Sequence, residues 1–399
     1  MAELGLIQDG AVAMSNGKVV AVGTTAEILE RYRALYELDV GGRVVLPGFV
    51  DAHTHPIFAG SREQEFEQRI AGATYLEIMA AGGGIMSTVR ATRVAPMSEL
   101  VQDGRARLER MLAHGTTTAE AKTGYGLATA DELKCLEAIH VLGASQPVDL
   151  VPTFLGAHAI PAEYQDRADA YVDLVVEQML PAVADGQPFA PVFCDVFCDE
   201  GAFDLDQTRR ILTRAKELGL SLKVHADEFA HLGAVCLAAE LGAVSAEHLL
   251  RTPEDEVQAM AEAGTVGVLL PGTPFGLGLS EYANARMMIE AGLPVALGTD
   301  LNPGTCYCES MPFVMALACR FMSMTPAEAV VASTVNAAYA VGQGGVKGQL
   351  GPGYAADLVV LDADDYRHLA YRFGVNLVQL VVKHGSVVWP STATRDKST

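Results

Sequence analysis

A pair of histidines ends an apolar segment early in the chain, in the run LPGFVDAHTH over residues 46–55. Side chains two residues apart on a β-strand point to the same face, with Cα atoms about 6.6–6.8 Å apart. His53 and His55 can therefore offer two imidazoles to one metal ion. An isolated His-x-His pair is more often two histidines on a solvated turn, but the strand-like run before this pair favours a metal site.

Residues able to bind a metal or transfer a proton also end several later apolar runs. These are Glu120, Lys122 and Tyr125 after 116–121, His158 after 149–154, Asp199 and Glu200 after 192–197, His225, Asp227 and Glu228 around the end of 220–225, His248 after 243–247, and Asp300 after 294–299. Three imidazoles and one carboxylate suit Zn²⁺ or Fe²⁺ and leave room for a water molecule. We expect His53, His55, His225 and Asp300 to bind one such ion, which would lower the pKa of that water toward about 7.

Three of these residues admit a second interpretation. Asp300 could cap a helix, but it directly follows the apolar run 295–298, so the metal role is preferred. His248 could be a fourth imidazole ligand or could hydrogen-bond to the water or the substrate, and the second role is preferred. On a helix beginning near 229, Glu228 would share a face with His225 and could act as an acid–base group. A first-turn glutamate that stabilises the helix dipole is the alternative.

Arg62 and Tyr125 are candidates for binding a substrate. The planar guanidinium of Arg62 suits a bidentate clamp on a carboxylate, although an ion pair with Glu63 or Glu65 would also explain it. Tyr125 stands between two glycines. We therefore expect it to be exposed and to hydrogen-bond to the substrate, with a packed loop tyrosine as the alternative.

A second, bridging metal is not expected. Two metals bridged by a carboxylated lysine would need a lysine at the end of the fourth strand, where the sequence over 193–198 is FCDVFC. Lys223 lies inside the fifth strand, two residues before His225. We expect one Zn²⁺ or Fe ion per subunit.

Alternating strands and helices must position these residues. The strand candidates are 46–52, 116–121, 149–154, 192–197, 220–225, 243–247, 265–270 and 294–299, and the helix candidates are 98–113, 130–143, 164–180, 204–218, 229–241, 253–263, 281–291, 309–322 and 325–340. Eight such units predict an α/β fold, a (β/α)8 TIM barrel over residues 46–340 with its active site at the C-terminal ends of the strands. Short strand candidates at 11–14, 19–22, 356–361, 378–383 and 386–389 predict a small β-sandwich domain made of residues 1–45 and 341–399. The long segment 56–97 is expected to carry function at the barrel mouth.

The composition disfavours several classes of function. Of the 399 residues, 50% are hydrophobic and 19% are charged, which suits one large domain and a smaller one. The formal net charge of -21 disfavours nucleic acid and anionic membranes as partners. No apolar run is long enough to span a bilayer, and the N-terminus lacks the pattern of a signal peptide. Seven scattered cysteines are typical of a reduced, cytoplasmic protein.

Six motifs, in order along residues 44–345, resemble the imidazolonepropionase family of the amidohydrolase superfamily. They are GSREQEF (60–66), GGGIMSTV (82–89), KTGYGL (122–127), TFLGAH (153–158), HADEF (225–229) and TDLNPG (299–304). The His-x-His pair alone marks only the superfamily, whereas the six motifs together are specific.

The resemblance implies an enzyme of histidine degradation, one that opens the ring of 4-imidazolone-5-propanoate hydrolytically to N-formimidoyl-L-glutamate. By position, it implies His53, His55, His225 and Asp300 as metal ligands. Arg62, Tyr125, His158, Glu228 and Thr305 match the family's substrate contacts, and Asn302 and Gly304, with Tyr125, match its product contacts. Glu228, His248 and Asp300 are the candidates for moving the proton of the water, and their individual roles stay open.

Two other functions are alternatives to this one. An amidohydrolase-type deaminase of a small heterocycle would share the metal site, but Arg62 and the Tyr125 loop favour a substrate with a carboxylate. A non-catalytic scaffold on the same barrel would be expected to lose ligands, and here every candidate is present. The expected partner is therefore a small-molecule substrate, while the oligomeric state is left open, a homodimer included.

Overall fold

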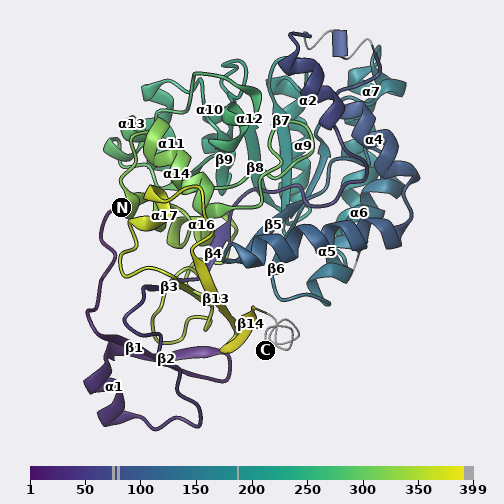
Figure 1. Cartoon of the computed structure of the whole chain (residues 1–399). Coiled ribbons are helices and arrows are strands. Elements are labelled where there is room, and N and C mark those ends of the chain that lie inside the picture. The colour runs from purple at the N-terminus through teal and green to yellow at the C-terminus, as the bar shows by residue number, and fades with distance from the viewer. Residues whose placement is uncertain (74–76, 79–80, 187, 391–399) are drawn as a thin grey trace.

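The computed structural model of the chain describes residues 1–73, 77–78, 81–186 and 188–390, so parts of the predicted segment 56–97 and of the small domain lie outside the described residues. Figure 1 shows a barrel wrapped by helices and, beside it, a smaller region built from the two ends of the chain. Among the described residues, no helix combines the length and the apolar character that crossing a bilayer requires.

Eight parallel strands form the barrel in sequence order, each hydrogen-bonded to the next along the chain. They are β4 (Phe49–Asp51), β5 (Thr116–Lys122), β6 (Asp149–Ala157), β7 (Phe193–Cys198), β8 (Ser221–Ala226), β9 (Ser245–His248), β10 (Val266–Leu269) and β11 (Val295–Leu297). A parallel bridge between Thr54 and Leu301 joins the segments that follow β4 and β11. There the Asp300 amide also donates to the His53 carbonyl at 3.0 Å. The predicted barrel is confirmed, and these contacts place the first and last strand ends side by side.

The first predicted strand, 46–52, is divided in the structure, so its prediction as one strand was wrong. β3 (Val45–Pro47) pairs antiparallel with β12 (Leu358–Leu361), whereas β4 pairs with β5 in the barrel. Gly48 lies between the two strands, at a position where a Cβ would lie 2.3 Å from the Thr117 hydroxyl oxygen. Only glycine permits this close approach.

Helices cover the outside of the barrel (Figure 1). They include α5 (Met97–Ala113), α6 (Thr129–Gly143), α7 (Ala168–Leu174), α8 (Leu180–Ala184), α9 (Leu205–Glu217), α10 (Ala234–Leu241), α11 (Glu254–Ala263), α12 (Gly272–Leu277), α13 (Ala285–Glu290), α14 (Met311–Phe321), α15 (Pro326–Ala332) and α16 (Val335–Ala340). Before α9, Asp204 Oδ1 accepts a hydrogen bond from the Gln207 amide at 2.8 Å, and Gln207 Oε1 accepts one from the Asp204 amide at 3.3 Å, which is a capping box. Such local signals explain why the predicted helix 204–218 matches α9 within a residue.

Several predicted helices differ from the structure. The predicted helix 325–340 is divided into α15 and α16, because Thr334 leaves the helical conformation and turns its hydroxyl to the Val330 carbonyl. The predicted helix 164–180 begins later, with α7, and continues through a π-helix over Val175–Met179. Segment 56–97 carries α2 (Glu63–Ile70) and α4 (Ile85–Val94).

Both ends of the chain supply antiparallel strands outside the barrel. β1 (Gly10–Ser15) and β2 (Lys18–Thr24) form a hairpin whose two turn residues, Asn16 and Gly17, have φ of 51° and 76°. β13 (Val378–Lys383) and β14 (Ser386–Trp389) continue the sheet of β12 and β3, and α1 (Thr25–Arg31) follows β2. The Val19 amide donates to the Tyr354 carbonyl at 2.9 Å, which links hairpin and C-terminal segment. The prediction of antiparallel structure built from both chain ends is confirmed.

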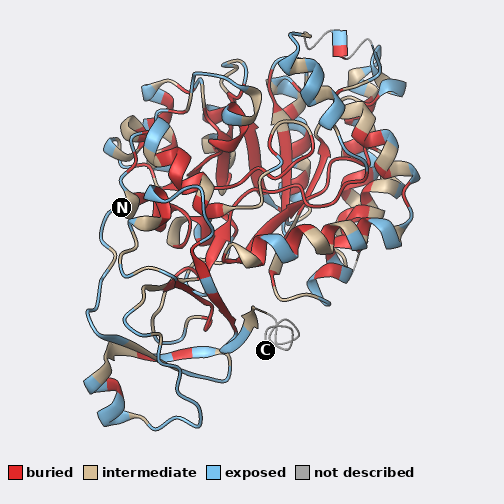
Figure 2. Cartoon of the chain, in the orientation of Figure 1, coloured by how far each residue is buried: buried red, intermediate tan, exposed pale blue. Residues whose placement is uncertain are grey.

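The barrel strands are almost wholly buried, whereas the hairpin is mostly exposed or half-buried and α1 is mostly exposed (Figure 2). The largest fully buried side chains are mostly aromatic or aliphatic, but Lys122 and Lys223 are among them. Fully buried lysines need partners of opposite charge, and those partners lie beneath the candidate active site.

Candidate active site

Four side chains meet at the mouth of the barrel, beyond β4, at the end of β8 and beyond β11. His53 Nε2 and His55 Nε2 lie 3.2 Å apart, and Asp300 Oδ1 lies 3.4 Å from the first and 3.5 Å from the second. The ring centroid of His225 is 4.5 Å from that of His53. The structure thus brings together all four residues that the sequence predicts as metal ligands.

The donor atoms in this place suit a divalent cation. Ligand atoms of His53, His55 and Asp300 lie within 4.8 Å of one another, and so do those of His53, His225 and His248. Nε2 of His225 is buried and has no hydrogen-bond partner among the described residues. Imidazole nitrogens gathered around one carboxylate are the donors that Zn²⁺ and Fe²⁺ prefer. His248 is close enough to be a ligand, so both interpretations of it stay open.

Burial keeps three of the imidazoles neutral, which is the form that binds metals. It lowers the pKa of His248 and of His158 to about 3 each, and together with nearby imidazoles it lowers that of His55. At His53, burial is the largest single influence and opposes a charge, but the carboxylates of Glu247 and Asp300 together outweigh it and raise the pKa to about 9. His53 therefore lies where positive charge is favoured.

Five charged side chains with no exposed surface lie beneath these imidazoles, and we call them the site cluster: Glu120, Lys122, Asp195, Lys223 and Glu247. Lys122 Nζ lies 3.0, 2.6 and 2.9 Å from carboxylate oxygens of Glu120, Asp195 and Glu247. Lys223 Nζ lies 3.0 Å from Glu120 and 3.1 Å from Glu247. Each lysine is thus held by at least two carboxylates.

The site cluster also contacts two of the predicted ligands. Asp195 Oδ2 lies 2.9 Å from Nδ1 of His225, and Glu247 contacts Nδ1 of His53. A carboxylate on Nδ1 fixes the tautomer and the orientation of an imidazole, so that Nε2 is left to face a metal. The cluster therefore positions the ligands from below.

Glu228 faces the same mouth, with Oε2 at 3.5 Å from His248 Nε2. Burial, then the charges of Asp300 and Asp199, raise the pKa of this carboxyl well above its usual range. A carboxyl with a raised pKa beside a neutral imidazole is an arrangement able to exchange protons near neutral pH.

The loop that carries Glu228 is fixed by Asp199. Its carboxylate accepts hydrogen bonds from the amides of residues 228, 229 and 230, at 2.8, 3.0 and 2.9 Å. Residues 227–233 form a loop that these hydrogen bonds hold in place, and α10 begins only at Ala234. The prediction that a helix puts Glu228 and His225 on one face was therefore wrong, although both residues reach the site.

Tyr125 is buried, with 3% of its surface exposed, so the expectation of an exposed side chain was wrong. Its ring centroid lies 5.9 Å from that of His55 and 5.3 Å from that of His158. His158 stacks on His55 at 5.0 Å. Tyr125 and His158 thus line the mouth beside a predicted ligand.

Glu132 holds the Tyr125 loop in place. Its buried carboxylate accepts hydrogen bonds from the amides of residues 124, 126 and 127, at 3.2, 2.8 and 2.8 Å. The loops that carry Glu228 and Tyr125 are therefore built in the same way, each around one carboxylate that collects three amides.

Arg62 lies at the rim of the mouth. Its Nε and Nη2 donate to Glu65 Oε2 at 3.0 and 2.7 Å, and a Cβ on Gly304 would lie 2.3 Å from its Nη1. Burial raises the pKa of Tyr125, and the positive charge of Arg62 partly offsets this rise. The Arg62 guanidinium is therefore close enough to Tyr125 to act on its hydroxyl group. The ion pair with Glu65 is present, and it holds the guanidinium against the loop after β11.

That loop is organised by Asn302. Its Oδ1 accepts the amides of Gly304 and Thr305 at 2.8 Å each, and its Nδ2 donates to the Asp300 carbonyl at 2.7 Å and to Thr305 Oγ1 at 3.0 Å. The side chain of Asn302 is therefore engaged within its own loop, where it shapes the backbone between Asp300 and Thr305.

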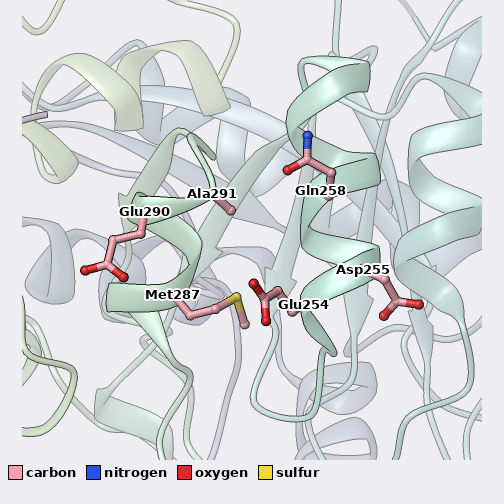
Figure 3. Close-up of a pocket in the computed structure, with 6 residues that line it drawn as sticks. All are labelled: Glu254, Asp255, Gln258, Met287, Glu290 and Ala291. Atoms are coloured by element: carbon pink, nitrogen blue, oxygen red, sulfur yellow. The ribbon is translucent and has the colours of Figure 1, made fainter.

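A separate hollow lies between α11 and α13, on the outer layer of the barrel (Figure 3). Figure 3 shows Glu254 directed toward Met287 of α13, whereas Asp255 points away from that helix. The hollow is lined by Glu254, Asp255, Gln258, Met287, Glu290 and Ala291. No predicted site residue lines it, so it is not the candidate active site.

Sequence reasoning missed the residues that position the site. The sequence patterns assign no role to Asp195, Glu247 or Glu132, and they mark Asp199 and Lys122 only as residues near strand ends. A signal was available, since Lys223 lies two residues before His225 on one strand face, and Glu247 and Asp195 interrupt otherwise apolar or small-residue strands. Charged residues inside strands that must be buried indicate a paired network.

The chain is similar to known proteins along almost its whole length. Residues 44–388 match the Amidohydrolase family, and residues 10–34 match the bacterial Imidazolonepropionase-like composite domain. The chain is 54% identical to the imidazolonepropionase of Herpetosiphon aurantiacus over 393 residues, covering 97% of this chain and 92% of the relative. It is also 54% identical to that of Chloroflexus aggregans over 395 residues, with the same coverage.

Solved structures share the fold at lower identity. Escherichia coli guanine deaminase superposes with a TM-score of 0.73 at 16% identity, covering 96% of this chain and 92% of that one. An adenosine deaminase from Xanthomonas campestris with bound zinc gives 0.71 at 21% identity, covering 95% and 88%. These likenesses establish the architecture, and the close sequence relatives establish the family. This chain belongs to the imidazolonepropionase family of the amidohydrolases.

Proposed function

We propose that the chain catalyses the hydrolytic ring opening of 4-imidazolone-5-propanoate to N-formimidoyl-L-glutamate. The observation that carries the proposal is one mouth that combines a His/Asp cation site, an acid–base pair and a guanidinium. The relatives named imidazolonepropionase support this choice of substrate. The guanidinium of Arg62 suits the propionate group, which a deaminase of a neutral heterocycle would not need to bind.

The family is metal-dependent, and we propose that one Zn²⁺ or Fe ion is bound by His53, His55, His225 and Asp300. Held there, the ion would lower the pKa of a water toward about 7 and would oppose the raised pKa of Glu228. The site cluster supports this assignment, because its carboxylates hold Nδ1 of His53 and His225 and so direct Nε2 outward.

Glu228 and His248 are the residues assigned to act on the attacking water and on the ring. Glu228 takes a proton from the attacking water, whose oxygen adds to an electrophilic ring carbon of the imidazolone. The ring C–N bond then breaks, and the same proton passes to the departing nitrogen. His248, 3.5 Å from Glu228, orients the water and stabilises the developing oxyanion. Asp300 is the alternative proton acceptor.

The substrate is oriented by residues around the same mouth. Arg62 anchors the propionate, while Tyr125, His158 and Thr305 contact the substrate. The loop shaped by Asn302, with Gly304 and Tyr125, contacts the product. We further propose a cytoplasmic location, which the seven free cysteines support. A homodimer is compatible with this proposal, and so is the division into residues 46–340 and a domain of 1–45 with 341–399.

The proposed function is tested by following the loss of imidazolone-propanoate absorbance, with metal analysis of the same sample. We expect turnover that a chelator abolishes and that added Zn²⁺ or Fe²⁺ restores. Guanine, adenosine and cytosine serve as comparison substrates. Chelator-sensitive deamination of one of these, without loss of imidazolone-propanoate, would replace ring opening by the deaminase alternative.

The residue roles are tested by comparing Glu228→Gln with Arg62→Ala. The first removes the proton carrier and should lower kcat by about 10²–10⁴-fold with little change in KM. The second removes a charge-assisted contact of about 1.5–3 kcal/mol and should raise KM by roughly 10–100-fold. Unchanged turnover in Glu228→Gln would exclude it as the base, and Arg62→Lys should recover only part of the affinity.

A further inference from the structure

A second group of metal-binding side chains lies outside the candidate active site. It consists of Asp227, His231 and Glu256, whose ligand atoms lie within 4.8 Å of one another. Asp227 directly follows β8, His231 lies four residues further along the loop, and Glu256 is in the first turn of α11. The proposed function uses none of the three.

Two carboxylate oxygens in this group are buried and unpaired. Asp227 has no exposed surface, and while its Oδ2 accepts the Thr252 hydroxyl at 2.7 Å, its Oδ1 has no hydrogen-bond partner among the described residues. Glu256 is 9% exposed, and its Oε2 likewise lacks a partner in the described part of the chain. Buried carboxylate oxygens normally bind a donor or a cation.

His231 supplies the third donor. Its Nε2 lies 2.9 Å from Glu256 Oε1, and this is the one ion pair found for Glu256 among the described residues. The same helical turn also carries Glu254 and Asp255, which extend from α11 in different directions (Figure 3). One imidazole therefore faces an excess of carboxylates, and local negative charge is left for a cation to neutralise.

We propose that Asp227, His231 and Glu256 form a second cation site, which takes a transition-metal ion of the Zn²⁺ type. Two carboxylates and one imidazole are donors found in zinc sites. Ca²⁺ and Mg²⁺ prefer oxygen ligands alone, so the imidazole disfavours them. Cys236 on α10 lies near enough to Glu256 for that carboxylate, after burial, to raise the pKa of its thiol, which adds a soft donor nearby.

A cation in this place would tie the loop after β8 to α11. The loop carries Glu228, and Asp199 already holds the amides of residues 228–230. A metal bound to Asp227 and His231 would fasten both sides of that segment. Its role is to hold the loop and not to supply the reacting water, so the inference is independent of the proposed function.

The test measures how much additional Zn²⁺ the full chain binds. Gel filtration first brings the protein to one bound Zn²⁺ per chain. Calorimetric titration with Zn²⁺ should then show one further equivalent in the parent protein. His231→Ala should lower the affinity for this second Zn²⁺ by at least about tenfold. Loss of a residue that only orients a metal ligand already costs about tenfold or more, and loss of a ligand should cost no less. His140→Ala is the matched control, an exposed histidine whose ring packs on Phe189, and it should bind as the parent does.

Thermal unfolding supplies an independent readout. Excess Zn²⁺ should raise the Tm of the parent and of His140→Ala, because an ion that binds only the folded state stabilises it. It should leave His231→Ala and Glu256→Gln unchanged. Absence of a second equivalent in the parent, or an unweakened one in His231→Ala, would overturn the site. Absence of imidazolone turnover with the second equivalent intact would instead count against the proposed function alone.

Discussion

Two clusters of lysines and carboxylates among the described residues differ in balance and in depth. The site cluster beneath the candidate ligands sets Lys122 and Lys223 against three carboxylates, all without exposed surface. The second cluster, which we call the base cluster, consists of Asp149, Lys347, Asp357 and Lys383. It joins the start of β6 to the C-terminal strands and sets two lysines against two aspartates.

The difference in balance matches a difference in use. In the base cluster, Lys383 Nζ lies 2.6 Å from Asp149 and 2.6 Å from Asp357, so the charges neutralise one another. In the site cluster one carboxylate remains in excess, and Glu247 and Asp195 extend to His53 and His225. The excess negative charge therefore falls on two predicted metal ligands, which favours positive charge there. A balanced cluster supports the fold, whereas an unbalanced one prepares a site for a cation.

The largest expected effect is that of Lys122→Met. This change leaves three buried carboxylates facing one remaining lysine, and breaking a buried charge network from one side costs about 3–5 kcal/mol. Because Asp195 and Glu247 would lose their anchor, metal affinity should also fall by about 10–100-fold. Differential scanning calorimetry and competition with a chelator measure the two effects. A full loss of stability with unchanged metal affinity would contradict the positioning role.

A smaller effect is expected for Lys383→Met in the base cluster. Two carboxylates are left, Asp149 and Asp357, and both keep Lys347 as a partner. The Asp149 side chain is also 39% exposed to water, so a cost of about 1–3 kcal/mol is expected. Metal affinity and kcat should be those of the parent, because the base cluster contacts the opposite end of the barrel strands. Equal losses of metal affinity in both variants would remove the distinction between the two clusters.

The fold was predictable because its signals are local and repeated. Apolar runs of strand length alternate with helices such as α9, whose cap and buried positions can be read from the sequence. The division at Gly48 was not predictable from the same signals, since it depends on the distance to Thr117, 69 residues away in the sequence. The loop before α10 is likewise held by Asp199, which directly follows β7, and helix propensity contains no information about that contact.

The candidate site was predictable in part. His53, His55, His225 and Asp300 stand where strands end, and barrel topology alone brings such positions together. The burial of Tyr125 depends on tertiary contacts. So do the loops held by Glu132 and Asp199, in which one carboxylate binds three backbone amides that make no hydrogen bonds of a regular helix or strand. Sequence patterns identify residues by their position on a strand or helix, whereas the residues that support the site are identified only by the tertiary contacts that their side chains make.

The smallest expected effect is a pH dependence confined to the base cluster. Burial would raise the pKa values of Asp149 and Asp357, but Lys383 and Lys347 outweigh burial and hold both below their ordinary value. A carboxylate with a lowered folded pKa stabilises the protein fully above its unfolded pKa of about 4, and this contribution is lost as pH falls through the folded value. The Tm difference between the parent and Asp357→Asn should therefore be greatest near neutral pH and should shrink below about pH 4. Asp362→Asn, in an exposed pair with Arg43, is the matched control and should lower Tm little at any pH. A Tm difference for Asp357→Asn that persisted unchanged into acid would show that its contribution is not one of charge.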